Sequence, residues 1–118
     1  MEKCVFCKIA VGEIPTQKIY ENRGFFSTPD KNPRTKGHSL VISKKHFETT
    51  LNMNSTLGTE LIDCIKGTVM NLMKKEKFDG FNILNNNFKA AGQVVKHVHF
   101  HIIPRRNGDN LEKELRFP

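Results

Sequence analysis

The chain has 118 residues, of which 37% are hydrophobic and 26% are charged. This length suits one domain with one core, and the composition is typical of folded globular proteins, not disordered ones. No apolar run is long enough to cross a bilayer, and Met1–Cys4 lacks the apolar stretch of a secretory signal. We therefore expect a cytoplasmic protein with no membrane partner and with reduced thiols.

The formal net charge is +7, which suits anionic ligands. The basic residues are scattered along the chain and often stand beside Glu or Asp, and there is no Trp. Because no stripe of Lys and Arg alternates with aromatic residues, the composition disfavours a nucleic-acid-binding module.

In chain order, the pattern first predicts a short helix that ends at Gly12, followed by three short strands and a loop. The expected bounds are 5–11 for the helix, 19–21, 24–28 and 38–43 for the strands, and 29–37 for the loop between the last two.

A long helix is expected from about residue 55 to about residue 77, because apolar residues recur there at helical spacing, although Gly67 weakens the pattern. A strand at 81–85 and a final strand at 97–103 follow, and Pro104 is expected to end the latter. Residues 1–118 are thus predicted to form a single α+β domain with a mostly antiparallel sheet, in which 105–118 is a charged, basic C-terminal tail that is loosely held.

His97, His99 and His101 alternate with apolar residues in the last predicted strand. Successive side chains of a strand point to opposite faces, so the three imidazoles share one face and the apolar residues pack beneath. A single histidine is most often a surface residue or a satisfied core residue, but three in strict alternation favour either a metal site or nucleophilic attack on phosphorus. The loop before them, which contains Asn86, Gly92 and Gln93, is of a kind that cradles phosphate oxygens, and it favours the second reading.

The segment His97-Val98-His99-Phe100-His101-Ile102-Ile103 closely resembles the signature of the histidine-triad (HIT) family of nucleotide hydrolases and transferases. The resemblance extends from Cys4 to Pro104 and includes the segments 12–15, 35–38, 44–47 and 90–95. It implies the HIT-like fold, a homodimer, and a substrate that is a purine nucleotide related to AMP.

The resemblance also implies roles for individual residues. His99 matches the nucleophile, which forms a nucleotidyl-histidine, and His101 matches a catalytic residue that contacts the phosphate. Gly92 and Gln93 match the loop that holds phosphate oxygens, with Gln93 also assigned to catalysis. Two further positions match substrate-binding residues: Asp30 for the ribose hydroxyls and Asn86 near the phosphate.

Cys4 and Cys7 have the spacing of a zinc-binding pair, although free thiols and a redox pair have the same spacing. The resemblance to zinc-containing, bacterial-type members of the family implies His46 and His97 as the other ligands. The expected cofactor is one structural Zn²⁺ per chain, since four protein ligands leave no open position. Cys64 is expected in the core and His38 in the pocket or in a structural position.

The sequence departs from the family at Phe88, where a glycine is usual, and at Lys31, where an apolar residue is usual. A bulky residue does not readily adopt a positive φ, so we expect an altered turn or a Phe88 ring that covers the pocket. Besides the leading hypothesis, a nucleoside phosphoramidase, two alternatives are a nucleotide-binding regulatory protein with vestigial catalysis and a zinc-only structural module.

Overall fold

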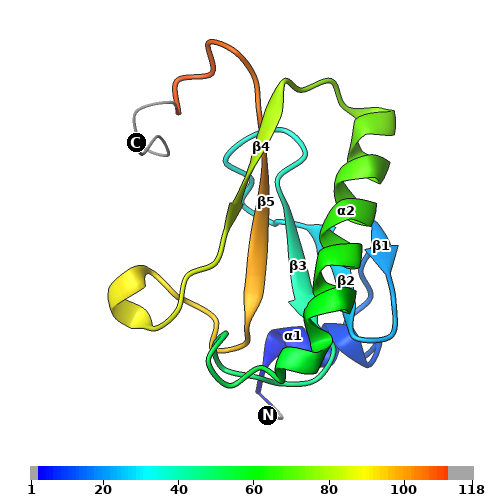
Figure 1. Ribbon diagram of the computed structural model, residues 1–118, viewed down its shortest axis with the longest axis vertical. Coiled ribbons are helices and arrows are strands. Elements are labelled where there is room, and N and C mark those ends of the chain that lie inside the picture. The colour runs from blue at the N-terminus through cyan, green and yellow to red at the C-terminus, as the bar shows by residue number, and fades with distance from the viewer. Residues whose placement is uncertain (1–2, 112–118) are drawn as a thin grey trace.

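The structure is a computed structural model that describes residues 3–111, and it contains a five-stranded sheet in the order β1-β2-β3-β5-β4 (Figure 1). All four strand pairs are antiparallel. The strands are β1 (Tyr20–Glu21), β2 (Phe25–Pro29), β3 (Ser39–Ser43), β4 (Gly80–Leu84) and β5 (His99–Arg105). The predicted α+β class and antiparallel sheet are confirmed.

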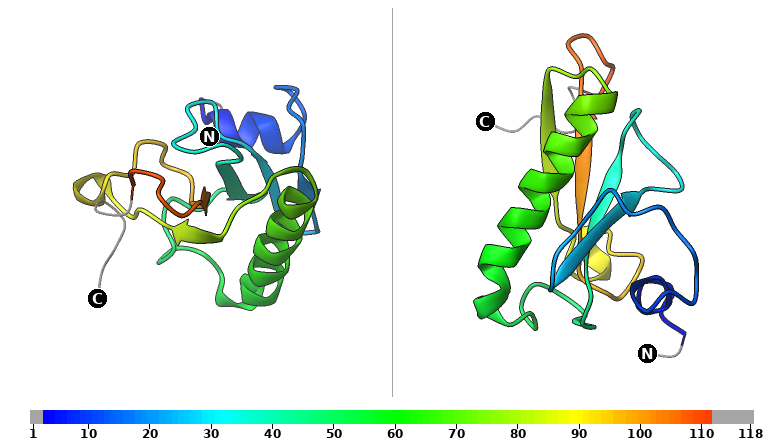
Figure 2. Two further views of the ribbon diagram at one scale, coloured as in Figure 1. Left: turned by 90° about the horizontal axis from the view of Figure 1, so that it is seen from above. Right: turned by 90° about the vertical axis from the view of Figure 1, so that its right-hand side faces the viewer.

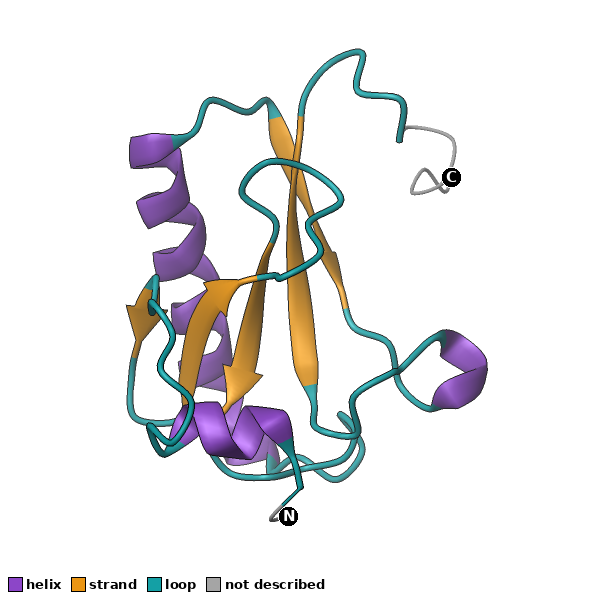
Figure 3. Cartoon of the chain, turned by 180° about the vertical axis from the view of Figure 1, so that it is seen from behind, coloured by secondary structure: helices purple, strands orange, loops and turns teal. Residues whose placement is uncertain are grey.

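Two α-helices lie on opposite faces of this sheet (Figure 2). The long helix α2 (Gly58–Lys75) covers one face, and the short helix α1 (Val5–Ala10) lies across one end of the other face (Figure 3). Single turns of 3₁₀ helix, η1 (Ser55–Leu57) and η2 (Lys89–Ala91), precede α2 and β5. The long helix therefore begins three residues later than expected, because its first predicted turn is 3₁₀.

The core has two parts, one on each face of the sheet. The part under α2 consists of nine buried residues: Phe25, Val41, Cys64, Ile65, Val69, Leu72, Val98, Phe100 and Ile102. The part under α1 is smaller and consists of Phe6, Ile9, Phe26, Leu40 and Ile42. Cys64 is fully buried in the first, as expected.

Gly67 has a packing role that the helical pattern alone did not reveal. A Cβ atom at this position would overlap the ring of Tyr20 in β1. The Tyr20 hydroxyl donates a hydrogen bond of 2.9 Å to Asp63, one turn earlier in the helix. The glycine therefore lets the edge strand approach the helix closely.

The expected bounds of the last strand were wrong at both ends. The strand begins at His99, because the Val98 N–H donates to the Phe47 carbonyl and not to a strand. It continues through Pro104 to Arg105, paired with β4. The Pro104 carbonyl accepts from the Thr35 hydroxyl, on the β3 side but beyond the first residue of β3, so its missing N–H leaves no gap in the ladder with β4.

The predicted tail is anchored over the part that the structure describes. Arg105 belongs to β5 and binds Asp109 and Asn82, and Arg106 donates to the carbonyls of Lys36 and Lys77. The rest of the tail, 112–118, lies outside the described residues. No helix among residues 3–111 has the length and apolar character needed to span a membrane.

Candidate active site and metal site

The three histidines of the motif lie on the α1 face of the sheet, as predicted. Their neighbours Phe100 and Ile102 point to the α2 face. Phe6 of α1 packs edge-on against His97 and His99, with ring centroids 5.7 and 5.1 Å apart. His97 and His99 are buried and His101 is partly buried, so α1 covers a row of imidazoles as well as its apolar cluster.

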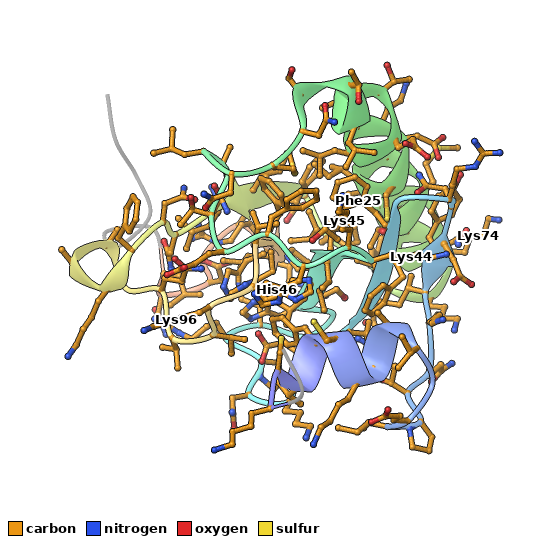
Figure 4. All side chains as sticks on the ribbon, turned by 90° about the horizontal axis from the view of Figure 1, so that it is seen from below. Phe25, Lys44, Lys45, His46, Lys74 and Lys96 are labelled. Carbon is orange, nitrogen blue, oxygen red and sulfur yellow. The ribbon has the colours of Figure 1, made fainter. Side chains whose placement is uncertain are left out.

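His97 belongs to a cluster with both N-terminal cysteines and His46. Its Nδ1 lies 3.3 Å from the sulfur of Cys4 and 3.5 Å from that of Cys7, and the Nδ1 of His46 lies 3.2 Å from the Cys7 sulfur. The four residues that we expected to bind zinc therefore converge, and their ligand atoms all lie within 4.8 Å of one another. His46 is seen between α1 and the sheet in Figure 4.

The donors of this cluster fit a tetrahedral zinc ion. The His97 Nε2 lies 2.7 Å from the Ser43 carbonyl, which can only accept, so the ring carries its proton there and its Nδ1 lone pair faces the sulfurs. Sulfur and nitrogen ligands of one tetrahedral zinc ion lie about 3.5 Å apart, close to the separations observed. Burial, together with the neighbouring Cys4, raises the pKa of the Cys7 thiol to about 11, so a pair of thiolates here needs a cation.

His99, in the middle of the row, also has a defined tautomer. Its Nδ1 lies 2.7 Å from the carbonyl oxygen of His97, so the proton is on Nδ1 and the lone pair is on Nε2. Burial lowers the pKa of His99, which keeps the ring neutral at physiological pH. A neutral imidazole with an unprotonated Nε2 is able to act as a nucleophile.

At the other end of the row, His101 meets His38 and Asp30. The His38 Nε2 lies 3.0 Å from the His101 Nδ1 and 3.4 Å from the Asp30 carboxylate. Burial lowers the pKa of both histidines, that of His101 to about 4. The other carboxylate oxygen of Asp30 accepts from the Asn32 N–H and so holds the loop in a turn.

The loop before β5 is held by amide side chains. The side chain of Asn85 donates to the His99 carbonyl, and that of Asn87 accepts from the Thr50 N–H. Asn86, between them, has no side-chain hydrogen bond within residues 3–111, and its amide nitrogen lies 3.6 Å from a Cβ position built on Gly92. Of the three asparagines, Asn86 is therefore the one whose amide remains available to a ligand.

Gln93 differs from the expectation for its side chain. Its oxygen accepts from the Phe88 N–H at 2.7 Å, and its two amide hydrogens point to the carbonyls of Glu48 and Val95. No amide hydrogen is left for a phosphate oxygen in this conformation. The contacts support a bracing role for the side chain, and its contact with phosphate stays a prediction.

Phe88 adopts the backbone conformation that the usual glycine would allow, with φ +70° and ψ 159°. This region is almost restricted to glycine, so the backbone of Phe88 is strained. The side chain is 54% exposed. Whether the turn differs from that of the relatives, or the ring covers the pocket, stays a prediction. Lys31, the other departure, is exposed.

Three contributors to the site could not be assigned from the sequence: His38, the Ser43 carbonyl and Asn85. Each acts through a partner far along the chain, His101, His97 and His99 respectively. Ser43 and Asn85 look like ordinary strand and turn residues. The sequence signals for His38 are its place in the segment 35–38 of the family resemblance and at the start of a predicted strand, and neither identifies His101 as its partner.

Comparison with known proteins places these features in one family. The family model of the HIT domain matches residues 11–108. An uncharacterized HIT-like protein of Methanocaldococcus jannaschii is 51% identical over 108 residues, which are 90% of this chain and 81% of that protein. A Streptococcus mutans protein, SMU.412c, has a solved structure with a TM-score of 0.89 and 42% identity, covering all of this chain and 74% of that one.

Two relatives carry the names of enzymes. The adenylylsulfatase HINT3 of Arabidopsis thaliana is 41% identical, and the match covers 92% of this chain and 55% of that protein. The adenosine 5'-monophosphoramidase HNT1 of Saccharomyces cerevisiae is 38% identical, with 88% and 63% covered. The family model, the sequence identities and the shared fold together show that the chain belongs to the HIT-domain family.

Proposed function

We propose that the chain is a nucleotide hydrolase that cleaves the bond between the α-phosphorus and the leaving group of purine nucleoside phosphoramidates or related adenylates. The observation that carries the proposal is the tautomer of His99, whose Nδ1–H is donated to the His97 carbonyl and whose Nε2 keeps its lone pair. Two relatives named as an adenylylsulfatase and a phosphoramidase support this substrate class.

In the proposed reaction, the Nε2 of His99 forms a bond to the α-phosphorus while the bond from phosphorus to the leaving group breaks. The leaving amine departs with the bonding pair and takes up a proton from solvent. A water molecule then attacks the phosphorus of the nucleotidyl-histidine and gives up a proton to solvent, the bond between phosphorus and the His99 Nε2 breaks, and the neutral imidazole returns. We assign the phosphate oxygens to Asn86, to the backbone at Gly92 and Gln93, and to His101.

The ribose hydroxyls are assigned to Asp30, whose carboxylate is only 16% exposed beside His38 and His101. An acidic side chain suits this role because ionised carboxylates only accept hydrogen bonds and hydroxyls donate them. The assignment places a carboxylate at the end of the histidine row.

We also propose one structural Zn²⁺ held by Cys4, Cys7, His46 and His97. When bound, the ion ties α1 to the residues just before β5, and so fixes the approach to His99. Reduced thiols are required for this site, which agrees with a cytoplasmic location.

A homodimer is proposed on the exposed apolar residues near the β4 edge of the sheet. Phe81 and Ile83 of β4 are 42% and 51% exposed, and Met70 and Met73 of α2 are 61% and 62% exposed. Edge strands with apolar side chains pair with another chain unless they are covered. Light scattering of the purified chain at micromolar concentration tests the dimer, and a monomer mass contradicts it.

The function itself is tested by the substitution His99→Ala. Turnover of an adenosine phosphoramidate is expected to fall by at least about a thousandfold, because no other unprotonated nitrogen replaces the nucleophile. Zinc content and melting temperature, measured on the same sample, are expected to stay close to those of the parent protein.

The substrate panel should include guanosine phosphoramidates, dinucleoside polyphosphates and sugar nucleotides. Full turnover by the His99→Ala variant would contradict the mechanism. Calorimetric binding of AMP by the parent protein without turnover of any member of the panel would instead favour a nucleotide-binding regulatory protein.

A further inference from the structure

His38, which the proposed reaction does not use, has partners on both ring nitrogens. It lies just before β3 and is 4% exposed. Its Nδ1 is 2.9 Å from the backbone nitrogen of Arg34, and its Nε2 is 3.0 Å from the Nδ1 of His101. The ring thus connects a main-chain N–H to a histidine of the triad.

The Arg34 contact determines where His38 carries its proton. A backbone N–H can only donate, so the Nδ1 of His38 must be the unprotonated nitrogen. The neutral ring then has its proton on Nε2, and burial, which lowers the pKa of His38, favours the neutral ring.

The Nε2–H of His38 has two acceptors within reach. The Nδ1 of His101 lies at 3.0 Å, while the nearer oxygen of Asp30 lies at 3.4 Å. The shorter contact makes the His101 Nδ1 an acceptor, and the neutral His101 ring must then carry its proton on Nε2.

We infer that His38 is a positioning residue that locks His101 in the Nε2–H tautomer, so that His101 presents an N–H donor beside the lone pair of His99. The rings of His99 and His101 are neighbours, with centroids 5.2 Å apart. One ring offers a nucleophile and the next a hydrogen-bond donor for a phosphate oxygen, although both are neutral histidines. The role of the His101 N–H as a donor to phosphate rests on the proposed function; the tautomer of His101 does not.

The proton on the His38 Nε2 also distinguishes the group of Asp30, His38 and His101 from the cysteine cluster. Asp30, His38 and His101 lie within metal-binding distance of one another. However, the His38 Nε2 that faces the group is protonated and has no lone pair for a metal, unlike the Nδ1 of His97. We therefore assign hydrogen bonding to this group and metal binding to the cysteine cluster.

Two substitutions at His38 separate its two hydrogen bonds. Glutamine places an amide N–H near the position of Nε2 and keeps the bond to His101, but it loses the acceptor for the Arg34 N–H. Asparagine places its oxygen near Nδ1 and keeps the Arg34 bond, but it does not reach His101.

The inference predicts opposite orders for turnover and stability. His38→Gln is expected to keep kcat within a few fold of the parent, whereas His38→Asn lowers kcat at least about tenfold with a smaller change in KM. The melting temperature is expected to fall more in the Gln variant, which removes the His38 acceptor of the Arg34 N–H. A purely structural role predicts that kcat follows the melting temperature, and that result would overturn the inference.

A second measurement does not depend on turnover. In protein labelled with ¹⁵N-histidine, the protonated and unprotonated ring nitrogens of a neutral histidine resonate in separate ranges, and the variant His101→Gln assigns the signals. We expect a protonated Nε2 and an unprotonated Nδ1 for His101 in the parent and in His38→Gln, and loss of this preference in His38→Asn. A protonated Nδ1 on His101 in the parent refutes the inference even if the phosphoramidase activity is found. The expected spectra without activity would refute only the proposed function.

Discussion

The two faces of the sheet are built from the same strands but carry different kinds of residues. Under α2 the buried residues are almost all apolar, and they form the larger part of the core. Under α1 the histidines of the triad lie beside a smaller apolar cluster. The Nδ1 atoms of His97, His99 and His101 face a cysteine sulfur, a backbone carbonyl and the ring of His38 respectively. One face mainly supplies stability, and the other supplies the chemistry.

β2 makes the same division between neighbouring residues. Phe25 and Phe26 are both fully buried, but Phe25 belongs to the core under α2 and Phe26 to the cluster with Phe6 and Ile9 of α1 (Figure 4 labels Phe25 on the α2 side). Because side chains alternate along a strand, two adjacent phenylalanines pack into different parts of the core.

The largest effect is expected from removing either of these rings. Phe25→Ala and Phe26→Ala should each lower the free energy of unfolding by about 3–5 kcal/mol, because each leaves a cavity in a fully buried site. Urea denaturation measures both.

The milder variants Phe25→Leu and Phe26→Leu should stay folded. They test whether zinc binding depends on the α1 face and not on the α2 face. Only Phe26→Leu is expected to weaken zinc binding, since α1 carries Cys7 and packs on Phe26. Equal zinc affinity in both variants would mean that the faces are not separable in this way.

The cysteines provide the next test, because Cys4 and Cys7 lie on the α1 side of the sheet and Cys64 lies on the α2 side. Cys7→Ser is expected to remove zinc from the chain and to lower stability by about 3 kcal/mol, since metal binding contributes directly to folding. Cys64→Ala, in the core under α2, should keep its zinc and lose only about 1 kcal/mol. Elemental analysis and thermal melting of the two variants decide the matter, and full zinc content in Cys7→Ser contradicts the assignment.

Gly67 tests how closely the α2 face is packed. Gly67→Ala should destabilise the protein by about 1–2 kcal/mol, because overlap with Tyr20 outweighs the gain in helix propensity of about 1 kcal/mol. Gly58→Ala is the matched control, since nothing lies within 4 Å of a Cβ there, and it should be neutral or stabilising. If both variants melt above the parent, Tyr20 moves aside without cost.

The sequence was sufficient to predict the order of the elements, the antiparallel sheet and the shared face of the three histidines. Those features follow from periodicity, which is local. The convergence of Cys4, Cys7, His46 and His97 was also expected, but from the resemblance to the family and not from spacing alone.

The hydrogen bonds that assign each histidine its proton could not be read from the sequence. The partner of His97 is a main-chain carbonyl at Ser43, and that of His38 is a main-chain N–H at Arg34. Any residue type supplies such groups, so the sequence carries no mark of them. The extension of β5 through Pro104 was missed for a related reason, since it depends on where β3 begins.

The smallest change in stability is expected at Phe88. This residue lies in the loop between β4 and β5 and belongs to neither part of the core. Its φ of +70° is strained for any residue with a Cβ atom, so Phe88→Gly should raise the free energy of unfolding by about 1 kcal/mol, the relieved strain exceeding the added chain entropy. Phe88→Ala removes the ring but keeps the strain, and it should give no such gain. Urea denaturation of the two variants therefore separates the backbone from the exposed ring. An equal gain in both would show that the ring, and not the positive φ, is the unfavourable element.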